Sequence, residues 1–173
     1  MNSYFRRQLV DYVEYHRDWW NGIMHVFGII LLFFGSVLPL STWSVSLFGI
    51  HTSAAVIAAL PVLAYWLLLD AALGIGIVVA AVFLLSGAGF LSAHLSVMGL
   101  WSVTLVLIVA GITCQVVGHR VFERRQPALL DNPTHFLLGP MFVMAKLFIA
   151  LGFKNDLAAI LRTPPKQAPS GQL

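Results

Sequence analysis

The chain has 173 residues, of which 59% are hydrophobic and only 10% are charged, and its formal net charge is +3. Soluble domains carry about 25% charged and about 45–50% apolar residues, so this composition excludes a soluble domain. Asp70 is the only charged residue between Gly22 and Val117, and an apolar block of that length predicts membrane-spanning helices. The positive charge lies in the flanks of this block, which favours anionic lipid headgroups over nucleic acid as a partner.

The first predicted element is an amphipathic helix from Tyr4 to Trp20. It carries charges of both signs, and Trp19 and Trp20 stand at its end. Tryptophan is enriched at the depth of the lipid headgroups. We therefore expect this helix to lie in the membrane interface.

Four apolar segments follow, each close to the roughly 17–25 residues that span a bilayer. They cover Gly22–Leu40, Ser53–Leu69, Ala71–Leu91 and Val97–Val117. Little more than Asp70 separates the second segment from the third, which predicts a tight helical hairpin at this residue. A fifth apolar stretch, Phe136–Gly152, contains Pro140 and Lys146, and we interpret it as a re-entrant or interfacial helix rather than a span.

The basic residues favour four spans over five. They gather before the first span, after the fourth and after the fifth stretch, whereas the loops at 41–52 and 92–96 carry no charge. Basic residues prefer the cytoplasmic side of short loops, and four spans place every basic cluster there.

The sequence therefore predicts an all-α integral membrane protein with both termini in the cytoplasm. It has four transmembrane helices, an N-terminal interfacial helix and a C-terminal re-entrant or interfacial helix. We expect a single bundle domain over residues 1–162. Residues 163–173, which contain proline, glycine and serine, are expected to form a flexible tail.

Histidine is the residue type that carries chemistry in this chain. The topology places His51 and His94 on one side of the membrane, and it gathers four others at the cytoplasmic face: His16, His25, His119 and His135. A continuous helix would point His16 and His25 to opposite faces, so we expect a break between them at Asn21-Gly22. Three or four neutral imidazoles suit Fe(II) or Zn(II) and exclude magnesium and calcium. Taken singly, an interfacial histidine is more often a headgroup contact or a satisfied core residue than a metal ligand, and only the group of four makes the metal site an equal alternative.

Polar residues accompany two of these histidines at helical spacing. Asn21 precedes His25 by four residues, and Gln115, His119 and Glu123 recur every four residues in an otherwise apolar helix. Asn21, Gln115 and Glu123 are candidates to accept the free ring N–H groups and to fix each tautomer. Arg120 is a candidate to hold a substrate carboxylate, although membrane anchoring also explains an arginine here.

Two motifs carry a resemblance to a known family. Residues 16–28 fit the pattern His-x4-Asn-x3-His-x2-Gly, and residues 115–129 fit Gln-x2-Gly-His-x3-Glu-x3-Pro-Ala-Leu. The second motif is followed by Asp131 and by the run Leu138-Gly139-Pro140-Met141-Phe142. In this order and at these distances, the motifs resemble the small multi-pass membrane family of the yeast-type Fe(II)-dependent 2-hydroxy-fatty-acid dioxygenase.

The resemblance implies an enzyme that uses Fe(II) and O2 to convert a 2-hydroxy fatty acid into a fatty acid one carbon shorter. It assigns metal binding and catalysis to His16, His25, His119 and His135. In that site we expect Arg120 and Asn21 to bind the substrate, and three further residues to support the ligands: Gln115, Glu123 and Asp131. Lys146 departs from the family pattern, in which an acidic residue often follows the Gly-Pro-x-Phe run. The tail has no lysine-rich retrieval signal, so we expect a bacterial inner membrane rather than the endoplasmic reticulum.

Two other classes of function remain open. A transporter or channel for a small ion would use Asp70 and the histidines as a relay, and it would hold no stoichiometric metal. A non-catalytic lipid-binding membrane protein would keep its function when the histidines are replaced.

Overall fold

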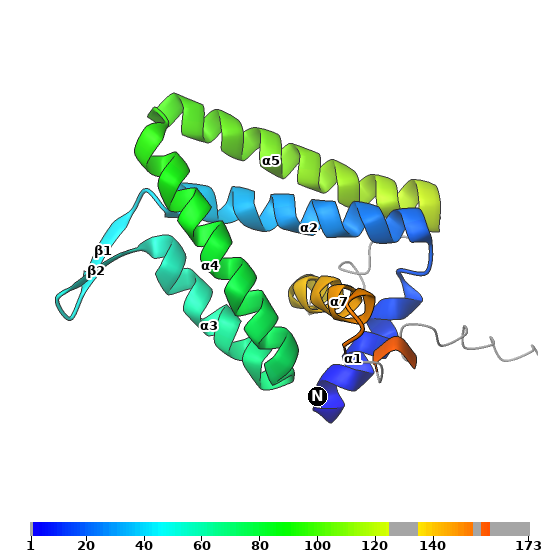
Figure 1. Ribbon diagram of the computed structural model, residues 1–173. Helices are drawn as coiled ribbons and strands as arrows, with labels where there is room; N and C mark the ends of the chain where they lie inside the picture. Colours follow the sequence, from blue (N-terminus) through cyan, green and yellow to red (C-terminus); the bar gives the residue numbers. More distant parts are fainter. Residues whose placement is uncertain (1, 125–134, 154–156, 160–173) are drawn as a thin grey trace, which may run out of the picture.

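The computed structural model describes residues 2–124, 135–153 and 157–159 of the chain. Its elements, in chain order, are α1 (Ser3–Glu14), α2 (Trp19–Leu40), β1 (Ser44–Leu47), β2 (Ile50–Ser53), α3 (Ala54–Leu69), α4 (Ala71–His94), α5 (Val97–Val117), η1 (Gly118–Glu123) and α7 (His135–Ala150). The long helices α2 and α5 lie side by side, and α1 and α7 lie together near one end of this pair (Figure 1). The tail expected at 163–173 lies outside the described residues.

The pair α2 and α5 makes the most extensive helix contact of the described bundle, and glycines let the two backbones approach. A Cβ on Gly111 of α5 would lie 2.7 Å from Leu32 Cγ and 3.1 Å from the carbonyl oxygen of Gly28. Small residues allow this close packing between helices in a membrane. Because the helices run antiparallel, the first turns of α2 lie beside the last turns of α5 (Figure 1).

The helical hairpin predicted at Asp70 is confirmed. Asp70 is 3% exposed, and its Oδ1 accepts hydrogen bonds from the backbone N–H groups of Ala72 and Leu73, both at 3.1 Å. An aspartate at this position satisfies N–H groups that the start of a helix leaves without partners. The structure therefore gives Asp70 the role of the cap that begins α4.

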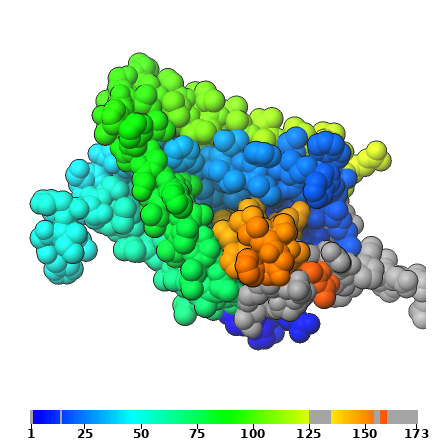
Figure 2. Space-filling model, in the orientation of Figure 1, coloured from blue at the N-terminus to red at the C-terminus, as the bar shows by residue number. Residues whose placement is uncertain are grey.

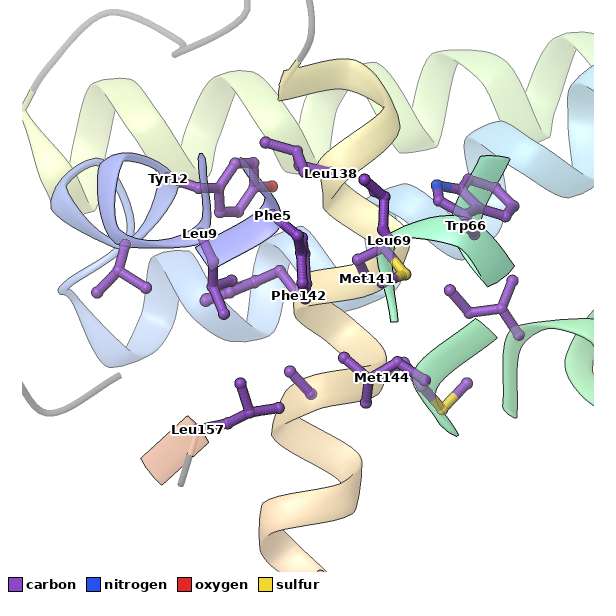
Figure 3. Packing of buried hydrophobic residues seen from close by; sticks show 14 residues of the cluster. Phe5, Leu9, Tyr12, Trp66, Leu69, Leu138, Met141, Phe142, Met144 and Leu157 are labelled. Carbon is purple, nitrogen blue, oxygen red and sulfur yellow. The ribbon is translucent and has the colours of Figure 1, made fainter. Parts of the chain in front are cut away.

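The main hydrophobic core joins α1, α7 and the α3–α4 hairpin (Figure 3). On α1, Phe5, Leu9 and Tyr12 recur at helical spacing and are all buried. They pack with residues of α7 and α3, among them Leu138, Met141, Phe142, Trp66 and Leu69. The N-terminal helix predicted to lie in the interface thus has its apolar face buried against protein, and this packing fixes its position next to α2.

The all-α prediction misses one element, the antiparallel hairpin β1–β2, which projects from the body of the molecule (Figure 2). Its turn uses Phe48 and Gly49 at positive φ, 50° and 81°, which is the geometry of a two-residue hairpin loop and one that glycine adopts without strain. Polar and apolar residues alternate only in β1, over four positions, whereas β2 has one apolar residue followed by three polar ones. That pattern is too short to distinguish a strand from a loop.

Among the described residues, three helices are long and apolar enough to cross a membrane: Trp19–Leu40, Ala71–His94 and Val97–Glu123. The helices α3 and α7 have 16 residues each. At about 1.5 Å per residue each is roughly 24 Å long, against a hydrocarbon core of about 30 Å. The segment expected as the second span is therefore shorter than predicted, because Ser53 caps α3 instead of belonging to it.

Candidate metal centre

Three histidines from separate parts of the chain meet at one point. One ring nitrogen from each of His16, His25 and His119 lies within 4.8 Å of those of the other two. The ring centroids are 4.2 Å apart for His16 and His25, 4.7 Å for His25 and His119, and 5.0 Å for His16 and His119. All three side chains are at most 5% exposed. We call this group the His triad.

The chain between α1 and α2 turns sharply, and this turn brings His16 to His25. The break falls at residues 15–18, not at Asn21-Gly22 as predicted, because Asp18 caps α2. Asp18 Oδ1 accepts from the N–H groups of Trp20 and Asn21 at 2.8 and 3.0 Å. Asn21 lies inside the helix, where its side chain has other partners.

The third histidine lies in η1, a π-helical turn that continues α5. Such turns widen the helix locally and are frequent at functional sites. Gly118 comes immediately before His119, and a Cβ at this position would overlap Asn21 Oδ1. The glycine therefore lets η1 approach the first turn of α2, so that His119 reaches His25.

A hydrogen-bonded chain fixes the ring of His25. Asn21 Oδ1 lies 3.1 Å from His25 Nδ1, and Asn21 Nδ2 donates to Glu123 Oε2 at 3.0 Å. Because the carboxylate can only accept, the amide nitrogen of Asn21 must face it, and the amide oxygen must accept from His25 Nδ1. Glu123 also accepts from the backbone N–H groups of Arg17 and Asp18, at 3.2 and 2.9 Å. The Glu123 carboxylate of η1 thus holds the α1–α2 turn in place. Through Asn21 it also determines which nitrogen of His25 carries the proton.

The ring of His16 is fixed by its own helix. His16 Nδ1 lies 2.7 Å from the backbone carbonyl of Tyr12, so this nitrogen donates and Nε2 keeps its lone pair. Burial is the main cause, and the neighbouring His25 the second cause, that hold the pKa of His16 well below its usual value. The ring is therefore neutral at pH 7. The neutral ring is the form of histidine that binds a metal.

Two ring nitrogens of the triad are buried without a hydrogen-bond partner in the part of the chain that the structure describes. They are His16 Nε2 and His119 Nδ1. A buried polar atom that lacks a partner costs free energy, about 1–3 kcal/mol. A divalent transition metal bound to these lone pairs would remove that cost, so the triad fits a metal ion by its donors, its protonation and its supporting hydrogen bonds.

The fourth predicted ligand, His135, lies in the same cavity but is not part of the triad. It begins α7 and is 3% exposed, and its Nε2 lies 3.1 Å from Asp11 Oδ2 on α1. The ring of Tyr12 contacts both His135 and the triad residue His16. It stacks on His16 with the ring centroids 4.0 Å apart, and it meets His135 edge-on with the centroids 5.3 Å apart.

The other predicted site residues take different places. Gln115 lines the cavity, and its Nε2 donates to the backbone carbonyl of His25 at 3.4 Å. Arg120 is exposed and is not among the residues that line the cavity, and Asn21 is fully buried behind His25. Asp131 lies outside the described residues. His51 and His94 are exposed, on the hairpin and at the end of α4.

The cavity beside the triad has a volume of about 140 Å³ and two chemically different ends. The polar side chains on its wall are Tyr12, His16, His25, Gln115, His119 and His135. The rest of the wall is formed by Ile29, Leu32, Phe33, Phe136 and Gly139. The apolar side chains of α2 continue one helix face from His25, at helical spacing. The cavity therefore suits a molecule with a polar head and an apolar tail.

Tyr12 and Lys146 lie near the triad, although neither was predicted from the sequence as a site residue. Tyr12 follows the stripe of Phe5 and Leu9 and precedes His16 by four residues, a spacing that places it beside that histidine. Lys146 of α7 lies with its Nζ 4.7 Å from the centre of the Phe142 ring. Gly22 leaves space for this ammonium group, since a Cβ there would lie 2.5 Å from Nζ.

Comparison with known proteins identifies the family. The family model described as 2-hydroxy-palmitic acid dioxygenase Mpo1-like matches residues 2–151. The 2-hydroxy-palmitic acid dioxygenase MPO1 of Saccharomyces cerevisiae is 32% identical over 158 residues, which are 90% of this chain and 86% of the yeast protein. No solved structure matches the chain. These matches confirm the resemblance carried by the two histidine motifs, and the chain belongs to the 2-hydroxy-palmitic acid dioxygenase Mpo1-like family.

Proposed function

We propose that this protein is an integral-membrane, Fe(II)-dependent dioxygenase that converts 2-hydroxy fatty acids into fatty acids one carbon shorter. The observation that carries the proposal is the buried His triad at the polar end of a cavity whose other end is apolar. The yeast relative is named for 2-hydroxy-palmitic acid, which supports the substrate class. The role of Asp70 as a helix cap weakens the alternative of an ion transporter that uses this residue as a relay.

The donor set suits Fe(II), and the three triad residues would hold it through neutral ring nitrogens. When bound, Fe(II) supplies the redox chemistry that lets O2 react with an organic substrate. The chain's own contribution is to fix the donors: Asn21 orients His25, and the Tyr12 carbonyl orients His16. His135, paired with Asp11, is the fourth histidine of the proposed site.

The cavity wall explains why the substrate would be a long-chain acid. The head of the fatty acid would lie among the histidines, and its chain would follow Ile29, Leu32 and Phe33 along α2. Each buried CH2 group contributes about 0.8 kcal/mol, so binding favours long chains.

The overall reaction balances with one molecule of O2. Loss of one carbon from a 2-hydroxy acid, R–CH(OH)–COOH, to give R–COOH removes four electrons, and O2 accepts four. The carbon of the original carboxyl group then leaves as CO2, together with one molecule of water. No further reductant is required.

The position of the triad supports four membrane spans. His25 lies near the start of α2 and His119 directly after α5, yet their rings are 4.7 Å apart. An even number of crossings between them would bring the two histidines to one face of the membrane, and α2, α3, α4 and α5 would supply four. The short α3 would require the bilayer to thin locally. The arginines Arg6, Arg7, Arg17 and Arg120 lie in α1, in the α1–α2 turn and in η1, which supports a cytoplasmic site with cytoplasmic termini.

The proposal is tested by turnover of defined substrates. Protein purified without oxygen and loaded with Fe(II) is mixed with 2-hydroxypalmitate and O2, and the products are measured by mass spectrometry. We expect the fifteen-carbon acid and CO2 in equal amounts, and no reaction of palmitate. Iron-loaded protein that leaves 2-hydroxypalmitate intact, or that instead carries ions across proteoliposomes, would contradict the proposed function.

A further inference from the structure

Building on the proposed function, we propose that the phenol hydroxyl of Tyr12 binds the carboxylate of the fatty acid by donating a hydrogen bond to it. Tyr12 is thus a substrate-binding residue of the site and not only part of the core around α1. Three observations on the described residues support this assignment: the hydroxyl has no hydrogen-bond partner among them, it borders the cavity, and the cavity wall lacks a cation.

The hydroxyl of Tyr12 has no hydrogen-bond partner among the described residues. Tyr12 is 3% exposed and lines the cavity, and its ring lies between α1 and α7 with the oxygen directed toward α7 (Figure 3). Within the described residues, the hydrogen bonds of Tyr12 involve only its backbone, which includes the carbonyl that holds His16. Buried tyrosine hydroxyls usually find a partner. This donor is therefore available to a molecule in the cavity.

The hydroxyl of Tyr12 borders the cavity beside Gly139, and both residues line it. A Cβ at position 139 would lie 3.5 Å from the Tyr12 hydroxyl oxygen and 2.8 Å from Ile29 Cδ1. A larger side chain would therefore press on Ile29 and crowd the hydroxyl. On the other side, the Tyr12 ring stacks on His16 with an angle of 9° between the planes. The hydroxyl thus lies between the triad and the path proposed for the acyl chain.

The charges around the cavity explain why a neutral donor is needed. Neither lysine nor arginine occurs among the described residues that line it, and Arg120, which the sequence suggested for the carboxylate, is exposed elsewhere. A hydrogen bond from a phenol to an anionic oxygen is stronger than one between neutral groups. Lys146 lies near the triad but does not line the cavity, so Tyr12 can hold one carboxylate oxygen from the wall itself.

Tyr12→Phe tests this role, because it removes the hydroxyl and keeps the ring that packs on His16. Binding of palmitate and of hexadecane-1,2-diol is measured without oxygen, and kcat/KM is measured with 2-hydroxypalmitate. We expect palmitate to bind about tenfold to a hundredfold more weakly. The diol, which lacks the carboxylate, should bind as tightly as before, and iron content and Tm should stay unchanged. Tyr4→Phe, which alters a tyrosine of α1 that is 39% exposed, is the matched control and should behave as the unmodified protein.

Unchanged palmitate affinity in Tyr12→Phe would overturn the inference, and so would an equal loss for palmitate and the diol. The binding measurement does not depend on turnover. A protein that binds palmitate through Tyr12 but does not oxidise 2-hydroxypalmitate would therefore refute the proposed function and leave this inference standing.

Discussion

Glu123 shows how much of the site depends on a single side chain that contacts none of the triad rings directly. Its carboxylate accepts N–H groups from Arg17, Asp18 and Asn21, and so connects η1 to the turn before α2. Removing it would leave the Tyr15 carbonyl, 3.2 Å from Asn21 Nδ2, as the remaining acceptor for this amide, and would weaken the hold on the ring of His25. Partners of this kind behind a metal ligand typically change metal affinity by about 10–100-fold.

We therefore expect Glu123→Gln to bind Fe(II) roughly 10–100-fold more weakly, because an amide places a donor against N–H groups that need an acceptor. Competition with a chelator of known affinity measures the change. Arg7→Gln, which alters an exposed charge on α1, should have no effect. A Glu123→Gln protein with unchanged affinity would show that the Asn21–Glu123 contact does not position His25.

The residues of the site could be predicted from the sequence only in part. Spacing and topology brought His16, His25 and His119 together, and the four-residue interval between Asn21 and His25 predicted their contact. The role of Glu123 was not predictable in detail, because its partners lie more than 100 residues away in the chain. Tyr12 was missed because an aromatic stripe on an amphipathic helix is equally explained by lipid contact.

At the scale of elements, α2 carries both the triad ligand His25 and the apolar wall of the cavity. Phe33 stacks on Phe136 of α7 with centroids 5.7 Å apart and lies 5.9 Å from the Trp66 ring. Phe33 and Phe136 line the apolar part of the cavity, and Trp66 packs against Phe33. We therefore expect these rings to limit the length of chain that the cavity accepts.

Phe33→Ala should extend the cavity and shift the preferred substrate to longer chains. We expect kcat/KM for an eighteen- or twenty-carbon 2-hydroxy acid to rise relative to 2-hydroxypalmitate, because about 0.8 kcal/mol is gained for each additional buried CH2. Phe83→Ala on α4, where the side chain is 74% exposed, is the control. An unchanged chain-length profile would place the acyl chain elsewhere.

The distance between α2 and α5 sets the distance between His25 and His119. Gly111→Ala would push Leu32 and the backbone of Gly28 away, whereas Gly89→Ala on α4 meets nothing within 4 Å. We expect Gly111→Ala to lower the free energy of unfolding by about 1–3 kcal/mol and to reduce iron content. Gly89→Ala should be neutral or stabilising by up to about 1 kcal/mol. Thermal unfolding in detergent compares the two, and equal Tm values would contradict the close packing.

The helices themselves were largely predictable, since apolar length identifies membrane helices without knowledge of their partners. Two features of the fold were not predicted from the sequence. The hairpin β1–β2 depends on a turn at Phe48 and Gly49 that short alternation does not reveal. The break before α2 falls at Asp18 and not at Asn21-Gly22, because the Asp18 carboxylate accepts hydrogen bonds from the first N–H groups of α2 and so begins the helix there.

For the whole molecule, the triad requires that the start of α2 and the end of α5 lie on the same side of the membrane. Single cysteines can test this in a Cys114→Ser background. With a membrane-impermeant maleimide on intact cells, Phe48→Cys and His94→Cys should be labelled, whereas Arg7→Cys should be labelled only after permeabilisation. Labelling of Phe48→Cys and Arg7→Cys from the same side would contradict the four-span arrangement.

The central claim is that His16, His25 and His119 hold one iron ion. Its most direct test is the iron content of protein purified without oxygen, measured by mass spectrometry for the unmodified chain and for His16→Ala, His25→Ala and His119→Ala. We predict about one iron per chain for the unmodified protein and for His94→Ala, and a loss of nearly all iron in each triad variant. Full iron content in the triad variants would contradict the account.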